Sequence, residues 1–194
     1  MTSFARDAAI IGTSVALGLV VTVALVIVGN VVLGRLSRRS RVRVRVVHVC
    51  DGDTIVVTLP SGKRETVRLL GVDAPETVHP DMPVQPFGPE ASAFTRRELL
   101  GKTVTLHSDP SQADRDRYGR LLRYVWDGNG RLFQVRQLRQ GYAREYTFGG
   151  RAYRYQRHFK AVEAAARREK RGLWHERNQR NGEVVAAQAR PRMG

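Results

Sequence analysis

Acidic side chains stand at both ends of one strand–turn–strand pattern in this chain of 194 residues. The four acids are Asp51, Asp53, Asp73 and Glu76. Between them lie two runs rich in β-branched and aliphatic residues, 55–59 and 67–72, separated by a turn cluster at 60–62. A hairpin returns its two ends to each other, so the carboxylates should converge. Because carboxylates at close range repel each other, we expect positive charge among them, either from Arg68 or from a hard divalent cation.

The chemistry of these acids favours an oxygen-coordinated cation. An Asp-Gly pair alone is a common turn, but four acids and an arginine on one hairpin favour a site. Asp53 and Asp73, one from each end of the hairpin, are the best candidate ligands, and all-oxygen ligation suits Ca²⁺ or Mg²⁺ better than zinc. The five histidines show no paired spacing, which also argues against zinc.

The spacing of Arg68 and Asp73 demands an irregular backbone. The two residues are an odd number of positions apart, so an unbroken strand would send their side chains to opposite faces. A shared site therefore requires the strand to break or bulge before Asp73, and Gly71 is the natural place for it.

Four stretches of the chain resemble the staphylococcal nuclease (thermonuclease) family. They are DGDT at 51–54, RLLGVDAPE at 68–76, GPEASAF at 88–94 and DRYGR at 116–120. The likeness runs from about residue 42 to residue 174 and leaves out the N-terminal segment and the tail. DRYGR taken alone would be a solvated surface turn. Its pairing with the first motif, in order and at fitting spacing, favours a site.

The resemblance implies a cofactor and catalytic roles. It favours Ca²⁺, with Mg²⁺ less favoured, bound by Asp53, Asp73, the backbone carbonyl of Ala74 and, through water, Asp51. Glu76 would activate the attacking water, and Pro75 before it restricts Ala74 to extended geometry. Arg68 and Arg120 would contact phosphate oxygens, because guanidinium forks match phosphate geometry.

Contacts to the rest of the substrate are also assigned by resemblance. Arg117 and Tyr118 would hold an adjacent phosphate or sugar, and Tyr146 is the candidate for stacking on a base, although Tyr142 and Phe148 lie in the same region. Relatives often carry Thr at the position of Ala74, a change that a carbonyl ligand should survive. Arg123 stands where relatives prefer a small residue, so either local packing or an extra phosphate contact should differ.

The pattern of elements predicts a small α+β domain. Strands are expected at 41–49, 55–59, 67–72, 103–106 and 121–126, and helices at 89–100, 132–140 and 153–170. In the last helix Tyr155, Phe159, Val162 and Ala166 fall on one face. Five short strands suit a closed β-barrel, and the resemblance identifies it as an OB-fold, a five-stranded barrel with about three helices.

Charge and cysteine content limit the partners and the redox chemistry. Lys and Arg total 33 against 18 Asp and Glu, a formal net charge of +15. This favours a polyanion, either nucleic acid or an anionic membrane surface. Cys50 is the only cysteine, so no internal disulfide can form, and it is expected to be a small core residue.

An uncharged apolar run near the N-terminus predicts a single-pass membrane anchor. The expected organisation is a flank at 1–7, a transmembrane helix at 8–34, a basic linker at 35–41, the nuclease-like domain at 42–176 and a disordered tail at 177–194. A span of the hydrocarbon layer needs about 20 apolar residues. The arginines after the span favour a cytoplasmic domain, whereas the resemblance favours the extracytoplasmic side, and the face stays open.

Three functions fit these observations. The first is a Ca²⁺-dependent nuclease that cuts DNA and RNA, preferably single-stranded, with little sequence specificity, and that by resemblance releases 3′-phosphate ends. The second is a catalytically inactive OB-fold that binds nucleic acid while tethered to a membrane. The third is a membrane-attached adaptor that uses its basic surface on lipids. The retained acids and arginines favour the first, in a chain expected to be monomeric.

Overall fold

The computed structural model describes residues 41–77 and 85–180, together with the single residue Thr22. The chain divides into two units, 1–39 and 40–194, and every element below belongs to the second. No helix among the described residues is long and apolar enough to cross a membrane. Apart from Thr22, the predicted span 8–34 lies outside those residues, as does most of the predicted tail.

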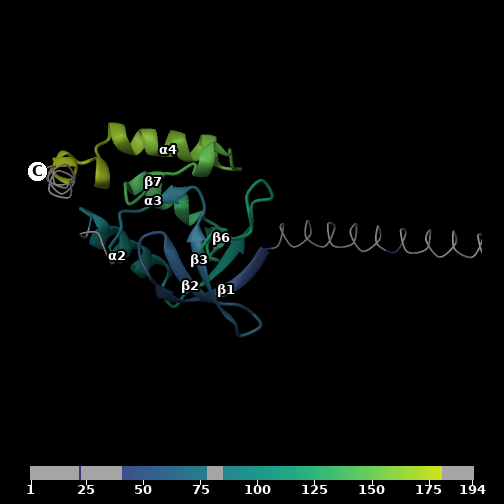
Figure 1. Ribbon diagram of the computed structural model, residues 1–194. Helices are drawn as coiled ribbons and strands as arrows, with labels where there is room; N and C mark the ends of the chain where they lie inside the picture. Colours follow the sequence, from purple (N-terminus) through teal and green to yellow (C-terminus); the bar gives the residue numbers. More distant parts are fainter. Residues whose placement is uncertain (1–21, 23–40, 78–84, 181–194) are drawn as a thin grey trace, which may run out of the picture. The chain divides into compact units, whose positions relative to one another are not determined.

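Five strands close into a barrel in the order β1-β2-β3-β6-β5 (Figure 1). Their bounds are Arg41–Val49 (β1), Thr54–Thr58 (β2), Arg64–Leu69 (β3), Thr103–His107 (β5) and Leu121–Trp126 (β6). Two further strands, β4 at Val72–Asp73 and β7 at Arg144–Glu145, pair with each other in a small separate sheet. The predicted five-stranded OB-fold barrel is therefore confirmed. The expected single strand 67–72 was wrong, because the structure divides it at Gly71.

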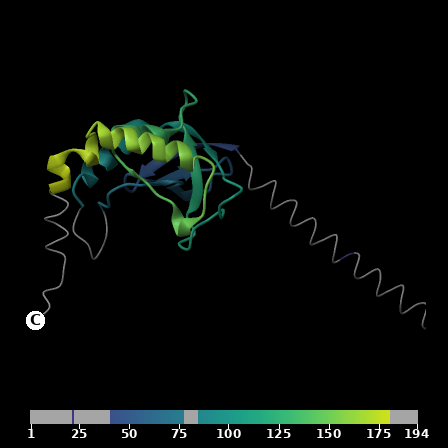
Figure 2. The same cartoon turned by 90° about the horizontal axis from the view of Figure 1, so that it is seen from above.

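Three α-helices accompany the barrel. Among the described residues they are α2 at Gly88–Leu99, α3 at Phe133–Gln140 and α4 at Gln156–Arg168. Short 3-10 turns lie before α4, at Phe148–Gly150, and after it, at Gly172–Trp174. α3 packs on β6, and α4 packs on α3 as an outer layer (Figure 1 and Figure 2). The predicted inner face of α4 is confirmed, with Phe159 and Ala166 buried and Tyr155 and Val162 half-buried. Burying one such aromatic side chain contributes about 1.5–3 kcal/mol.

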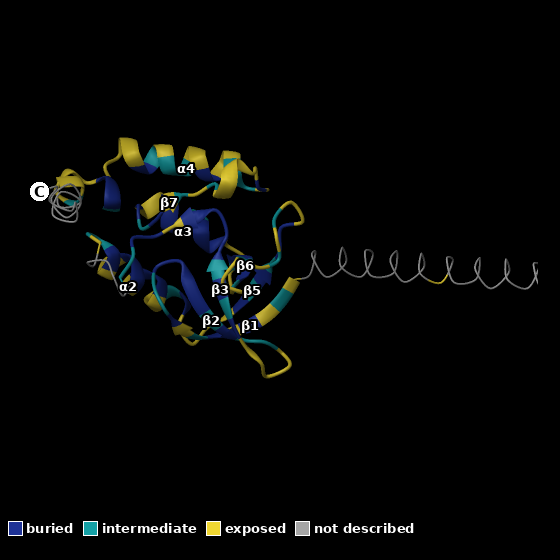
Figure 3. Cartoon of the chain, viewed as in Figure 1, coloured by how far each residue is buried: buried dark blue, intermediate teal, exposed yellow. Residues whose placement is uncertain are grey.

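The alternation of β1 separates the barrel interior from its outer surface. Val44 and Val46 are buried, and the arginines between and before them are exposed (Figure 3). The register with β2 shifts between Val46 and His48, so Val47 is an extra residue at a bulge. The bulge reverses the phase of the alternation, and Val49 then returns to the core.

Pairing of β3 on both edges gathers three chain segments at one end of the barrel. β2 and β3 form an antiparallel hairpin in which Thr54 lies opposite Arg68. β3 also pairs in parallel with β6, with Arg68 opposite Leu122. The start of β2, the end of β3 and the start of β6 therefore meet, as the hairpin pattern predicted for the first two.

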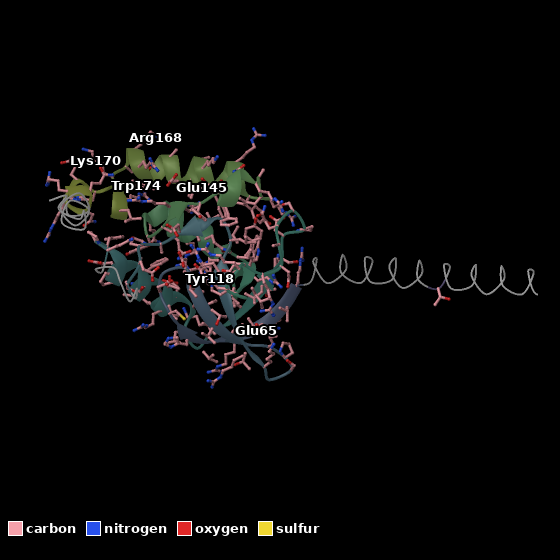
Figure 4. All side chains as sticks on the ribbon, viewed as in Figure 1. Glu65, Tyr118, Glu145, Arg168, Lys170 and Trp174 are labelled. Carbon is pink, nitrogen blue, oxygen red and sulfur yellow. The ribbon has the colours of Figure 1, made fainter. Side chains whose placement is uncertain are left out.

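An ion pair braces β3 against the loop that precedes β6. Glu65 on β3 (Figure 4) receives two hydrogen bonds from Arg115, at 2.8 and 3.1 Å, and Arg115 also donates to the carbonyl of Gly119 at 2.7 Å. Lys63 lies 2.6 Å from the same carboxylate. These hydrogen bonds, those from Arg115 first, lower the pKa of Glu65 from 4.5 to about 2. The brace holds the 116–120 turn against the barrel.

We expect Glu65→Gln to lower the free energy of unfolding by about 1–2 kcal/mol at pH 7, because charge-assisted hydrogen bonds are lost from a pair whose arginine is partly exposed. Because the pKa of Glu65 is lower in the folded protein than in the unfolded chain, the ionised carboxylate stabilises the fold above pH 4.5. This stabilisation is lost as the pH falls toward 2. Denaturant unfolding should therefore show the parent and Glu65→Gln converging over that window. Glu176→Gln, at an exposed pair with Lys170, is the control. A constant difference across the window would contradict the assignment.

Candidate active site

One guanidinium joins the two ends of the β2–β3 hairpin. Nη1 of Arg68 lies 3.0 Å from Oδ2 of Asp53, and Nη2 lies 2.8 Å from Oδ1 of Asp73. Nη1 also donates to the carbonyl of Val72 at 2.7 Å. The predicted convergence of Asp53, Arg68 and Asp73 is therefore present in the structure. Asp53 is buried, whereas the Asp73 side chain is 52% exposed, so the cluster opens to solvent on the Asp73 side.

The backbone break that this convergence requires occurs at Gly71. β3 ends at Leu69, and Gly71 has φ 76°, in the left-handed region that favours glycine. A Cβ there would lie 2.6 Å from the ring of Tyr153, whose hydroxyl donates to the carbonyl of Gly71 at 3.2 Å. The turn brings Asp73 back to the side of the sheet occupied by Arg68, as predicted.

Asp53 is held in an electrostatically costly position. Its Oδ2 accepts the backbone N–H of Ala74 at 2.7 Å, and its Oδ1 accepts the hydroxyl of Thr54 at 3.0 Å. Burial raises the pKa of Asp53 from 3.8 to about 8 and outweighs the opposing effect of Arg68; the negative charges of Asp51 and Asp73 raise it further. Ionisation of Asp53 is therefore unfavourable in this position, and a bound cation would favour the charged form.

The donor set fits a hard cation. Asp53 and Asp73 offer carboxylate oxygens, which Ca²⁺ and Mg²⁺ prefer. Among residues 41–77 and 85–180 no group of three or more His, Cys, Asp or Glu side chains is placed to hold a metal ion by itself. A cation here would therefore take its remaining ligands from backbone carbonyls, water or substrate phosphate. Asp51 accepts the backbone N–H of Asp53 through Oδ1 at 3.1 Å, which leaves its second oxygen for a contact through water.

The DRYGR turn reaches the first motif through Thr54. Asp116 accepts the backbone N–H groups of Tyr118 and Arg120 through Oδ1, at 2.9 and 3.0 Å, and pairs through Oδ2 with Nε of Arg120 at 2.6 Å. Nη1 of Arg120 lies 3.5 Å from Oγ1 of Thr54, at the long limit for a hydrogen bond, and Thr54 in turn bonds Asp53. Arg120 and Arg68 therefore approach the same carboxylate from different sides.

The backbone of Glu76 is fixed beside this cluster. Ala74, two residues earlier, donates its N–H to Asp53. The main chain of Glu76 makes two hydrogen bonds with Gln85, one through its N–H and one through its carbonyl. The N–H of Glu76 donates to Oε1 of Gln85 at 3.2 Å, and its carbonyl accepts the N–H of Gln85 at 3.0 Å. The Glu76 residue is half-buried. These contacts hold the backbone of Glu76 against Gln85.

The predicted substrate residues lie on the surface near these segments. Tyr118 is 67% exposed (Figure 4), and the guanidinium carbons of Arg117 and Arg120 lie 4.7 and 5.3 Å from its ring centroid. Tyr146 is 45% exposed, and its N–H donates to the carbonyl of Gly71 at 3.1 Å, next to the turn that positions Asp73. Phe148 is exposed with its ring 6.4 Å from that of Tyr146.

Two of the residues considered in the sequence serve the fold instead. The ring of Tyr142 stacks between Phe94, at 4.3 Å, and Phe87, at 5.3 Å, so it belongs to the core. Arg123 is buried, and Nη2 pairs with Asp114 at 2.7 Å while Nη1 donates to the carbonyl of the same residue at 3.1 Å. Asp114 therefore holds the Arg123 side chain inside the domain.

Sequence reasoning missed the residues that hold the loop between Asp51 and Asp53. The carbonyl of Gly52 accepts hydrogen bonds from Thr95 on α2, at 2.7 Å, and from Nε2 of Gln137 on α3, at 2.5 Å. A Cβ at Gly52 would collide with the Cβ of Ala74. The sequence feature that could have pointed to this contact is Gln137, a polar side chain at a buried position of α3. Two helices therefore position the acidic loop against Ala74.

Comparisons with known proteins identify the family of this chain. Residues 66–176, more than half of the chain, match the family described as staphylococcal nuclease homologue. A thermonuclease of Staphylococcus hyicus is 39% identical over 166 residues, which cover 81% of this chain and 95% of that protein. A thermonuclease of Staphylococcus intermedius is 48% identical over 96 residues (50% and 55%), and endonuclease YncB of Bacillus subtilis is 36% identical over 138 residues (71% and 64%). By the extent of these matches, this chain belongs to the staphylococcal nuclease family.

Proposed function

We propose that this protein is a Ca²⁺-dependent nuclease that hydrolyses phosphodiester bonds of DNA and RNA with little sequence specificity. The observation that carries the proposal is that Arg68 pairs with the buried carboxylate of Asp53, while Arg120, from a distant motif, reaches the hydroxyl of Thr54, which bonds the same carboxylate. The thermonuclease and endonuclease relatives support a nuclease. The Ca²⁺ requirement and the individual roles below are our proposal.

The arginines supply the positive charge that phosphodiester hydrolysis needs. Negative charge accumulates on the phosphate oxygens as a pentacoordinate phosphorane forms, and prearranged donors stabilise it. Arg68 uses Nη1 and one N–H of Nη2 in its contacts within the described residues, which leaves Nε and the second N–H of Nη2 for a phosphate oxygen. Arg120 is oriented by Asp116 and presents Nη1 toward the same cluster.

Glu76 is proposed to orient the attacking water and accept its proton. Asp53, Asp73 and the carbonyl of Ala74 would hold the Ca²⁺, with Asp51 contacting it through water. When bound, the cation supplies Lewis-acid polarisation of the phosphate. Arg117 and Tyr118 would hold a neighbouring phosphate or sugar, and Tyr146 would stack on a base. Stacking accepts any base, so little sequence preference is expected.

Replacing the proposed base should separate catalysis from binding. We expect Glu76→Gln to reduce the rate of single-stranded DNA hydrolysis about a hundredfold to ten-thousandfold, the usual contribution of a general base. Affinity for the DNA and the melting temperature should change little. The matched control is Glu90→Gln, at an exposed acid in the first turn of α2. Hydrolysis by Glu76→Gln at the parent rate would show that another group accepts the proton.

The proposed ion should stabilise the folded chain directly. At about a hundredfold excess over its dissociation constant, Ca²⁺ should raise the melting temperature by roughly 5–10 °C. Asp53→Asn should lose most of this increase, because a carboxylate ligand is removed. KCl at equal ionic strength is the control for general screening. If the parent melted at the same temperature with Ca²⁺ and with a chelator, the metal part of the proposal would be wrong.

The contacts to Gly52 predict a difference between two buried glutamines of α3. Gln134 bonds the backbone of β6, whereas Gln137 bonds Gly52. Either change to Leu should cost about 1–3 kcal/mol of stability. We expect only Gln137→Leu to weaken Ca²⁺ binding, by roughly threefold to tenfold, since a shifted carbonyl at Gly52 displaces the acids beside it. Calorimetric titration below the melting temperature measures this, and equal effects of the two variants would refute it.

A further inference from the structure

The outer surface of β1 carries a row of exposed arginines. Arg41, Arg43 and Arg45 occupy alternate positions, all exposed, while Val44 and Val46 between or after them are buried. Alternate residues of a strand are about 6.7 Å apart on one face. Within the described ranges none of these three guanidiniums lies within 4.0 Å of a carboxylate.

The neighbouring strands do not neutralise this row. On β5 the residues opposite are His107, Thr105 and Thr103, and on β2 Thr58 lies opposite Arg45. The next residue across the sheet from Thr58 is another arginine, Arg64. Guanidiniums about 6.7 Å apart on one face of a strand repel one another. The row therefore carries a stability cost within the domain that a polyanionic partner would offset.

The positive potential extends to the adjoining edge of the barrel. The ring of His107 stacks on Trp126 at 5.3 Å, and the guanidinium carbon of Arg154 lies 5.4 Å from the ring centroid of Tyr155. Burial first, and then the charges of Arg41 and Arg154, lower the pKa of His107. The half-buried rings of His107, Trp126 and Tyr155 therefore lie beside Arg41 and Arg154.

We propose that this row, Arg41, Arg43 and Arg45, is a second contact site for the nucleic-acid strand that is cut at the other end of the barrel. The inference rests on the proposed nuclease function and extends it. The nine residues of β1 span about 26 Å. Val49, at the far end of the strand from Arg41, lies next to the acidic loop, so Arg45 stands about 13 Å and Arg41 about 26 Å along β1 from that end. A short oligonucleotide cannot bridge the two sites, whereas a longer strand can.

The composition of this surface favours a nucleic-acid strand over a lipid surface. Docking on a membrane adds buried apolar side chains to the electrostatic attraction. Among the described residues the exposed large hydrophobic side chains are Leu100, Tyr118, Tyr146 and Phe148, and none of them is on β1 or β5. On β5, Thr105 and Thr103 lie opposite Arg43 and Arg45, and hydroxyl groups donate to phosphate oxygens as guanidiniums do.

The test compares two double variants of the full-length chain. Arg41→Gln/Arg43→Gln removes two charges from the row, and Arg96→Gln/Arg168→Gln removes two exposed charges from the helices, with Arg168 near the end of α4 (Figure 4). Binding of a single strand of about 20 nucleotides is measured against salt concentration without Ca²⁺. Each lost phosphate contact should lower the slope by about 0.7, so the first variant should lose about 1.4 and the second little.

Hydrolysis rates give the second measurement. The ratio of kcat/KM for a strand of about 20 nucleotides to that for one of about three should fall roughly tenfold in Arg41→Gln/Arg43→Gln, because only the longer strand reaches the row. Arg41→Lys/Arg43→Lys keeps the charge and should retain most of the salt slope. Equal slopes for the two Gln variants, or an equal loss on long and short strands, would overturn the inference.

Two other outcomes separate the alternatives. If Arg41→Gln/Arg43→Gln weakened binding to anionic phospholipid vesicles but left the salt slope for DNA unchanged, the row would be a lipid contact and the inference would be wrong. If the parent hydrolysed neither strand yet the slopes still differed by variant, the proposed nuclease function would fail while the strand contact stood.

Discussion

The site depends on the ion pairs that Arg68 makes with Asp53 and Asp73. A buried carboxylate is costly unless a partner compensates it, and the cost is visible in the raised pKa of Asp53 even with the guanidinium at 3.0 Å. The same guanidinium pulls an exposed acid, Asp73, toward a buried one. The protein thus keeps the acids Asp53 and Asp73 close together around Arg68. This arrangement suits a positively charged ligand, and it lowers the free energy of unfolding.

The rest of the barrel serves to hold that arrangement. The pairing of Thr54 with Arg68 fixes one acid and the arginine across a hairpin, and the left-handed turn at Gly71 returns Asp73 to them. Thr95 on α2 and Gln137 on α3 donate hydrogen bonds to the carbonyl of Gly52 and so hold the loop 51–53 beside Ala74. Glu65 and Arg115 fasten the turn that carries Arg120. The contacts of Thr95 and Gln137 with Gly52, and of Arg115 with Glu65, join segments that are 43, 85 and 50 positions apart.

What could be predicted from the sequence was local in origin. The alternation of 41–49, the inner face of the last helix and the need for a break near Gly71 all follow from periodicity and parity, which act over a few residues. Contacts such as Gln137 with Gly52, 85 positions apart, depend on how the helices pack on the barrel and leave no local pattern. The role of Arg123 was ambiguous because its carboxylate partner, Asp114, lies in a loop whose path the sequence does not specify.

The parallel pairing of β3 with β6 also has a consequence for biosynthesis. Arg120 and Thr54 are 66 positions apart, and an antiparallel hairpin cannot make this pairing, so β6 must pair with β3 before the second motif meets the first. A chain emerging from the ribosome would expose the acids and Arg68 early, yet it would lack the complete cluster until β6 had docked. Long-range closure therefore delays the assembled site until most of the domain has been synthesised.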